Sequence, residues 1–220
     1  MSRVDAGGIE LHLLAGKAAW WPEGRTLLVA DAHLGKAVSF RRLGVPVPEA
    51  TTGGTLDALD ALLARHDAQR IVFLGDLLHS RHAHARETLA AVAAWRALRP
   101  GLELVLVRGN HDDRAGDPPP EWGVQCVDEP WHLPGAPGLA LCHHPDAGLA
   151  PDGAYVLAGH LHPCTTVGQG IDRLRLPCFH FGARVGVLPA FGTFTGMHPI
   201  ARAAGDRVFL VADNAVLELP

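Results

Sequence analysis

Five short apolar segments, each ending where a cluster of polar residues begins, constrain the fold of this chain more than any other feature. They are nearly free of polar side chains, and they span residues 26–30, 71–74, 102–107, 139–142 and 155–158. Runs of this length without polar alternation are typical of strands that are buried on both faces. We therefore expect strands that deliver polar side chains at their carboxyl ends.

Two segments between the first three of these strands have apolar side chains at helical spacing. One carries Leu56, Leu59, Leu62 and Leu63, and the other carries Leu89, Val92, Trp95 and Leu98 before Pro100 and Gly101 stop it. Strands that alternate with helices predict an α/β sheet, and such sheets bind ligands at the carboxyl ends of their strands. The sequence therefore predicts that the polar clusters meet at one sheet edge.

The chain outside these units has the composition of antiparallel β-structure. Residues 9–14 and 18–21 predict a strand pair, and short strands separated by Gly and Pro follow residue 162. The last two strands, 208–211 and 215–219, flank a turn at Asp213 and Asn214. With no repeat and no linker, residues 1–220 are expected to form a single domain in which this half packs on the first.

Composition narrows the function classes. The formal net charge of −4 argues against a dedicated nucleic-acid binder with a basic face, although bound divalent metals would change the local field. No segment is apolar for long enough to span a membrane, so a cytoplasmic protein is expected. The four cysteines form no CxxC pair, which predicts free buried thiols. The excess is in histidine, the commonest metal ligand, with 14 copies.

The polar clusters carry the residue types of a metal site. They comprise Asp31 with His33, Gly75 with Asp76, Gly109-Asn110-His111-Asp112, His143 with His144, and His160 with His162. The H-x-H pair would place two imidazoles on one face of a strand, because strand side chains alternate. Each cluster alone could be a helix cap or a set of solvated loop residues. Their shared position after apolar strands favours one convergent site instead.

In order and spacing, these motifs resemble the calcineurin-like metallophosphoesterase superfamily. Residues 29–36, 40–48, 75–80 and 188–196 further resemble its ligase-associated branch. The superfamily resemblance implies an α/β four-layer sandwich of two β-sheets flanked by helices. The branch resemblance implies a DNA endonuclease linked to a DNA ligase, an exonuclease and a helicase.

The resemblance also implies a site with two divalent metal ions. Asp31, His33 and His162 would hold one ion, Asn110, His143 and His160 would hold the other, and Asp76 would bridge them. Mixed carboxylate, imidazole and amide ligation suits Mn²⁺ first, with Fe²⁺ or Zn²⁺ as alternatives, better than Mg²⁺. Such a pair can hold an attacking hydroxide, so no protein nucleophile is needed.

The general acid for the leaving group would be His111, beside the expected ligand Asn110. In the superfamily an acidic residue three positions after the bridging aspartate often orients this histidine, but here that position is His79. Asp112 is a candidate substitute. Between His143 and His144, the end of the apolar strand favours His143 as the ligand.

These features predict metal-dependent phosphodiester hydrolysis, with single-stranded or unpaired DNA as the substrate of a DNA repair enzyme. One alternative keeps the chemistry but acts on small nucleotides or other phosphate esters, as a phosphodiesterase or phosphomonoesterase. Another is a binding scaffold without activity, which the intact ligand set argues against. Lys36, Arg41 and Arg42 would either contact the phosphate backbone or form a solvated helix face.

Overall fold

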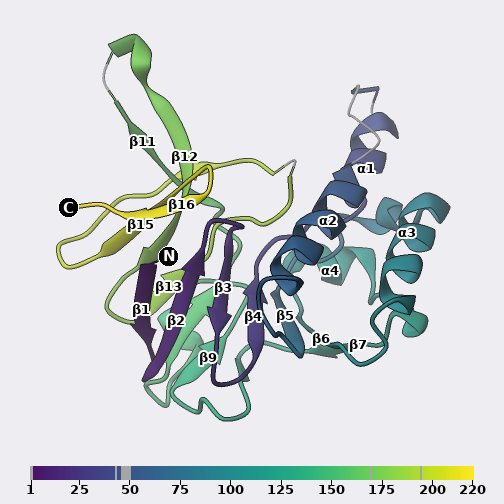
Figure 1. Ribbon diagram of the computed structural model, residues 1–220, viewed down its shortest axis with the longest axis horizontal. Coiled ribbons are helices and arrows are strands. Elements are labelled where there is room, and N and C mark those ends of the chain that lie inside the picture. Colours follow the sequence, from purple (N-terminus) through teal and green to yellow (C-terminus); the bar gives the residue numbers. More distant parts are fainter. Residues whose placement is uncertain (1, 43, 46–50, 169, 194) are drawn as a thin grey trace.

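Two β-sheets lie face to face, and α-helices cover the outer face of the first sheet (Figure 1). This computed structural model describes residues 2–42, 44–45, 51–168, 170–193 and 195–220. The arrangement confirms the predicted α/β sandwich. The two sheets meet along the edge at which the polar clusters gather.

The first sheet has seven strands in sequence order. They are β1 (Ser2–Ala6), β2 (Ile9–Leu14), β3 (Ala18–Trp21), β4 (Thr26–Val29), β5 (Arg70–Leu74), β6 (Glu103–Val107) and β7 (Val124–Val127). Strands β1 to β4 are antiparallel, and β4 to β7 are parallel, with Val29 opposite Phe73 and Leu74 opposite Val107. The carboxyl ends of β4, β5 and β6 therefore lie side by side. The sequence pattern did not reveal β1, an edge strand with alternating burial.

The second sheet has the order β14-β11-β12-β13-β10-β9-β8, and β15 and β16 extend from β12. Its strands are β8 (Trp131–His132), β9 (Leu139–Leu141), β10 (Tyr155–Ala158), β11 (Pro163–Val167), β12 (Leu174–Phe181), β13 (Val185–Val187), β14 (His198–Pro199), β15 (Arg207–Ala212) and β16 (Ala215–Glu218). Strands β9 and β10 belong here, so the expectation that all the polar clusters sit on the edge of one sheet was wrong. In Figure 1, β11 and β12 project beyond the body of the molecule.

The helices of the described residues lie beside the first sheet. They are α1 (Lys36–Arg42), α2 (Thr51–Leu63), α3 (Arg86–Ala97) and α4 (Asn110–Ala115), with the 3-10 turns η1 (Arg81–His84) and η2 (Pro120–Trp122). Two further 3-10 turns, η3 (Ala147–Leu149) and η4 (Gly170–Asp172), belong to the second half of the chain. Leu56, Leu59 and Trp95 pack on the sheet as their spacing predicts. Leu98 does not, because α3 ends at Ala97 and leaves this side chain 77% exposed.

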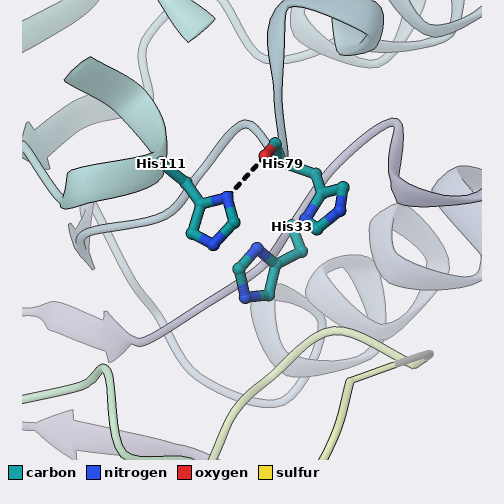
Figure 2. A group of neighbouring side chains, drawn as sticks. All are labelled: His33, His79 and His111. Atoms are coloured by element: carbon teal, nitrogen blue, oxygen red, sulfur yellow. Dashed lines mark hydrogen bonds between the residues drawn. The ribbon is translucent and has the colours of Figure 1, made fainter. Parts of the chain in front are cut away.

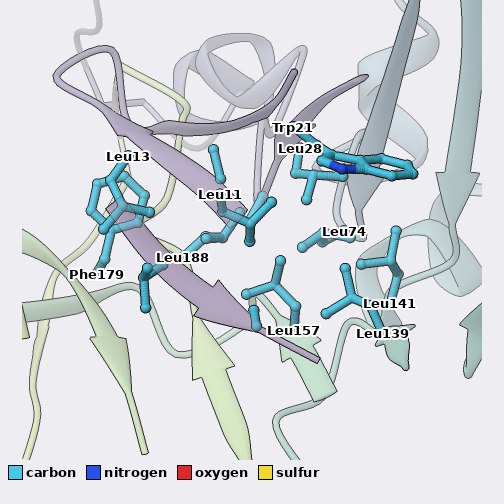
Figure 3. Packing of buried hydrophobic residues seen from close by; sticks show 14 of the residues in the cluster. Leu11, Leu13, Trp21, Leu28, Leu74, Leu139, Leu141, Leu157, Phe179 and Leu188 are labelled. Carbon is cyan, nitrogen blue, oxygen red and sulfur yellow. The ribbon is translucent and has the colours of Figure 1, made fainter. Parts of the chain in front are cut away.

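Alternating side chains explain why the strands are apolar throughout. Leu28 and Leu74 point into the core between the sheets, where they join residues such as Leu157 and Phe179 (Figure 3). Their neighbours Leu27 and Phe73 point to the helical side. Burying one such side chain stabilises the folded state by roughly 1.5–3 kcal/mol. Side chains on both faces of each strand therefore stabilise the sheet.

The fourth layer, over the outer face of the second sheet, is thin. Leu149 of η3 and the following Ala150 pack there against Ala140, Val156 and Ala158. Within the described residues, no helix has the length and apolarity that crossing a membrane requires. The four cysteines are free, and three of them are buried, as predicted.

Candidate metal centre

The seven predicted ligands converge where the two sheets meet. Asp31 and His33 follow β4, Asp76 follows β5, and Asn110 begins α4 directly after β6. The second sheet supplies the rest: His143 after β9, and His160 and His162 after β10. Strands far apart in sequence thus deliver their polar ends to one place.

Asp31, His33 and His162 form the first group. The two imidazoles face each other with Nε2 atoms 3.3 Å apart, and His162 Nε2 lies 3.4 Å from Asp31 Oδ1. Their potential ligand atoms all lie within 4.8 Å of one another. Asp31 is completely buried, and its Oδ1 has no hydrogen-bond partner. A buried carboxylate oxygen without a partner is costly unless a cation completes the site.

Asn110, His143 and His160 form the second group. His143 Nε2 lies 3.0 Å from Asn110 Oδ1 and 3.0 Å from His160 Nδ1. The other nitrogen of His143, Nδ1, donates to the Leu74 carbonyl oxygen at 3.2 Å. That bond holds the proton on Nδ1 and leaves Nε2 with a lone pair directed at the group, as in metal-ligating histidines.

Asp76 lies between the two groups and faces both. Its Oδ1 is 3.5 Å from His143 Nε2, and its Oδ2 is 3.9 Å from His33 Nε2. Oδ1 also accepts a hydrogen bond from the backbone N–H of His111 at 3.0 Å. The side chain is therefore placed to offer one oxygen to each of two cations.

The donor atoms fit divalent ions in spacing and in protonation. Two ligand atoms that each lie about 2.0–2.1 Å from one ion are about 2.8–3.4 Å apart, from the octahedral to the tetrahedral angle. The distances of 3.0–3.4 Å at His162 and His143 fall in this range. A ligating imidazole must be neutral. Burial, followed by neighbouring basic groups, lowers the pKa of His33 and that of His160, and at His160 the charges of Asp31 and Asp76 oppose the shift. Both rings are therefore held in the form that binds metal.

The backbone at these ligands adopts left-handed conformations that side chains other than glycine rarely take. Five of the seven have positive φ: Asp31 (54°), His33 (48°), Asp76 (50°), His160 (69°) and His162 (47°). Each costs on the order of 1 kcal/mol or more, so the surrounding structure must enforce it. Strain concentrated at one cluster is characteristic of a functional site.

Two glycines next to the ligands are required by close packing. A Cβ on Gly75, whose φ is 77°, would lie 2.1 Å from His143 Nδ1. A Cβ on Gly109 would lie 2.4 Å from Asp76 Oδ1. These glycines let ligands from different strands approach one another, which explains why Gly precedes Asp76 and Asn110 in the sequence.

His111 is oriented by a backbone carbonyl group (Figure 2). Its Nδ1 donates to the carbonyl oxygen of His79 at 2.6 Å, and its Nε2 lies 3.9 Å from Asp76 Oδ2. The His79 ring stacks on the His111 ring with centroids 5.0 Å apart. The candidate substitute, Asp112, does not take this role, because its carboxylate accepts hydrogen bonds from the backbone N–H groups of Leu78 and Gly109 instead. The expectation for Asp112 was therefore wrong.

Asp112 instead ties together two loops of the centre. Its Oδ1 accepts from the N–H of Leu78 and its Oδ2 from the N–H of Gly109, each at 3.0 Å. The side chain is buried, and burial raises its pKa to about 6. The loop after β5 and the start of α4 are thus fixed relative to each other.

Replacing Asp112 with alanine should lower the free energy of unfolding by about 2 to 4 kcal/mol, because two buried N–H groups lose their acceptor. Urea unfolding of the metal-free protein measures this change. Asp113→Ala, at an exposed position of the same helix, is the matched control and should shift stability by less than about 0.5 kcal/mol. Equal effects of the two variants would contradict the anchoring role.

The structure distinguishes the adjacent histidines His143 and His144. The His143 ring is buried among the ligands, whereas the His144 side chain is 42% exposed and pairs through Nδ1 with Glu129 Oε1 at 2.5 Å. The other carboxylate oxygen of Glu129 accepts from the backbone N–H groups of both histidines. Glu129 thus fixes which of the two adjacent histidines faces the other ligands. It was missed because nothing in its sequence context signals a role.

The basic residues of α1 lie in different environments. Lys36 is partly buried, and burial lowers the pKa of its amine, opposed by the charges of Asp31 and Asp76. Arg41 pairs with Glu87 at 2.7 Å. Lys36 lines a small cavity together with His33, whereas Arg41 is engaged in a surface ion pair.

Metal binding should be visible in stability. An ion at 100 times its dissociation constant stabilises the folded state by about 2.7 kcal/mol per site, so Mn²⁺ should raise the Tm of chelator-treated protein by roughly 5–10 °C for each site that it fills. Mg²⁺ should shift it less, because imidazole suits it poorly. Differential scanning fluorimetry measures the shifts. No shift with Mn²⁺, Fe²⁺ or Zn²⁺ would contradict the fit.

The two-sheet fold and the paired ligand groups define a metal-dependent hydrolase that acts on phosphate esters. The family model of the calcineurin-like phosphoesterase matches residues 24–137, so the chain belongs to this family. The chain is similar to Pseudomonas putida nuclease MPE, whose crystal structure is known. The two sequences are 44% identical, the match covers 99% of each chain, and the TM-score is 0.85. YfcE, a phosphoesterase from E. coli, is 15% identical over 88% of this chain and 97% of its own, with a TM-score of 0.40. No curated protein sequence matches.

Proposed function

We propose that this protein is a divalent-metal-dependent phosphodiesterase, and specifically an endonuclease that cuts single-stranded or unpaired DNA in DNA repair. The observation that carries the proposal is the position of Asp76 between two complete ligand groups, each drawn from both sheets. The choice of a nucleic acid is supported by the similarity, over nearly the whole chain, to a protein described as a nuclease.

In this proposal each ligand group holds one ion. Asp31, His33 and His162 would hold the first, Asn110, His143 and His160 would hold the second, and Asp76 would contribute to both. When bound, the ions, which we propose to be Mn²⁺ with Fe²⁺ or Zn²⁺ as alternatives, would supply the nucleophile from water and neutralise phosphate charge. The chain contributes their spacing and a buried environment that strengthens the electrostatics.

His111 would deliver the proton to the leaving oxygen. Because its Nδ1 already donates to the His79 carbonyl, Nε2 is the atom free to face the substrate. The same bond limits rotation of the ring, which preserves the alignment that proton transfer needs. Lys36, beside Asp31 and Asp76, would contact a phosphate oxygen.

Two further proposals come from the sequence: a cytoplasmic location, for which its composition speaks, and a functional link to a DNA ligase, an exonuclease and a helicase, which the branch resemblance supports. The alternative substrate, a small phosphate ester, uses the same centre. A substrate comparison separates the two.

The deciding experiment incubates circular single-stranded DNA with the enzyme and Mn²⁺, Mg²⁺, Zn²⁺ or Ni²⁺, alongside chromogenic phosphate diesters and monoesters. The proposal expects metal-dependent nicking of the circle that is lost in Asn110→Ala, a position 3.0 Å from the ring of His143. The exposed control Asp113→Ala should retain it. Hydrolysis of the chromogenic esters with no nicking would favour the small-ester alternative, and nicking that survives in Asn110→Ala would point to a contaminating nuclease.

A further inference from the structure

A pocket opens directly beside the candidate metal centre and takes no part in the chemistry described above. It has a volume of about 540 Å³, within the range of roughly 300–1,000 Å³ that small-molecule sites occupy. His160, whose Nδ1 contacts His143, belongs to its wall. The pocket and the position for the second metal ion are therefore separated by one side chain.

The wall combines apolar surface with a few polar groups. Leu161 and residues 199–201 supply the apolar part. Leu161 is 42% exposed although it lies between the two ligands His160 and His162. Strongly apolar walls with few polar groups are what ligand sites typically present. A flat ring could rest on this surface and cover the exposed leucine.

Imidazoles supply the polar part of the wall. His198 is exposed and lies with its ring 6.3 Å from that of His162. His180 is fixed by a hydrogen bond from its Nε2 to Asp206 Oδ2 at 2.7 Å, which leaves Nδ1 as its other hydrogen-bonding atom. Aromatic rings of this kind stack on bases, and every base has a face to stack.

The pocket is held rigidly relative to the centre. The N–H of His198 donates to the carbonyl oxygen of His162 at 3.0 Å, and the N–H of Ile200 donates to that of Cys164 at 3.1 Å. Strand β14 pairs with β11, which begins immediately after His162. A group bound in the pocket would thus keep a constant distance from a phosphate at the metals.

We propose that this pocket, which we call the base pocket, binds the nucleobase next to the scissile phosphate by stacking and apolar contact. The assignment rests on the proposed function, and it explains a preference for unpaired strands. A base can enter the pocket only when it is free of its duplex partner, because a paired base is stacked within the helix. The phosphate at the metals and the base in the pocket would then fix one nucleotide at two points.

The test compares binding of deoxyadenosine 5′-monophosphate and 2-deoxyribose 5-phosphate to the Mn²⁺-loaded protein by calorimetry. The wild type should bind the nucleotide at least about fivefold more tightly, since one stacked base contributes about 1–3 kcal/mol. Ala201→Trp, which fills the pocket from an exposed position, should abolish this advantage. Ala204→Trp, also exposed but outside the pocket, should keep it.

Activity gives a second measurement. Ala201→Trp should lower kcat/KM on single-stranded DNA at least tenfold more than on bis(4-nitrophenyl) phosphate, which has no base. If this variant does not fold, His198→Ala is the deciding variant. It should reduce the ratio of the affinities for the nucleotide and for 2-deoxyribose 5-phosphate at least threefold. Equal affinities of the wild type for the two phosphates, or an advantage that persists in both variants, would overturn the base pocket.

The outcomes separate this inference from the function on which it rests. Wild-type protein that favours the nucleotide through the pocket but never nicks DNA would retain the base pocket and remove the endonuclease. Wild-type protein that nicks DNA but shows no base advantage would retain the endonuclease and remove the pocket.

Discussion

Replacing Asp76 with alanine is expected to lower kcat/KM for bis(4-nitrophenyl) phosphate by at least about 10³-fold. The carboxylate faces both ligand groups, with Oδ1 3.5 Å from His143 Nε2 and Oδ2 3.9 Å from His33 Nε2. Without it, two closely spaced cations would repel each other with no bridging anion. A loss of about 4 kcal/mol of transition-state stabilisation corresponds to roughly 10³-fold in rate.

Metal content and rate should be measured on the same preparation. Asp76→Ala should retain fewer than two metal ions per chain after gel filtration, whereas the control Asp113→Ala should behave as the wild type does. Asp76→Asn, which preserves shape and one oxygen, should recover part of the metal content and little of the activity. An Asp76→Ala enzyme with two ions and more than a tenth of the wild-type rate would rule out the bridging assignment.

Replacing His111 with alanine is expected to affect substrates according to their leaving groups. Turnover of DNA, whose leaving alkoxide needs a proton, should fall by about 10²- to 10⁴-fold. Hydrolysis of bis(4-nitrophenyl) phosphate should fall much less, because a nitrophenolate leaves without protonation. Metal content should stay at the wild-type level, since no predicted ligand is removed.

A matched histidine separates this effect from a general loss of imidazole. His132 lies on β8 and is exposed, with its Nε2 3.6 Å from Asp152. His132→Ala should leave both rates within about twofold of the wild type. Equal losses on both substrates in His111→Ala would argue against a general acid and in favour of a structural role for the ring near Asp76.

Much of the site could be predicted because the ability of a side chain to bind metal depends on its residue type, which the sequence gives directly. Asp31, Asp76 and His160 each follow an apolar strand, and strand ends are where open sheets place functional side chains. The residues that support them carry no such signal. Glu129 acts from a loop, and His79 orients His111 through its carbonyl oxygen, a group that every residue possesses.

The incorrect expectations for Asp112 and Leu98 have the same origin. Asp112 stands where it could have oriented His111, but its carboxylate turned out to bind the N–H groups of Leu78 and Gly109, which only the packing of two loops brings within reach. Leu98 continued the apolar spacing of α3, yet the helix ended before it. Local patterns describe one segment at a time and cannot report which neighbour is nearest.

The sequence by itself determined the fully buried apolar strands, the main helices and the set of side chains able to bind metal, because burial and ligand chemistry depend on residue type and spacing. Only the tertiary structure decided that β9 and β10 join the second sheet, so that the ligands come from two sheets and enclose Asp76 between them. An apolar run specifies that a strand is buried on both faces. It does not specify its partner, since backbone hydrogen bonds are alike in every strand.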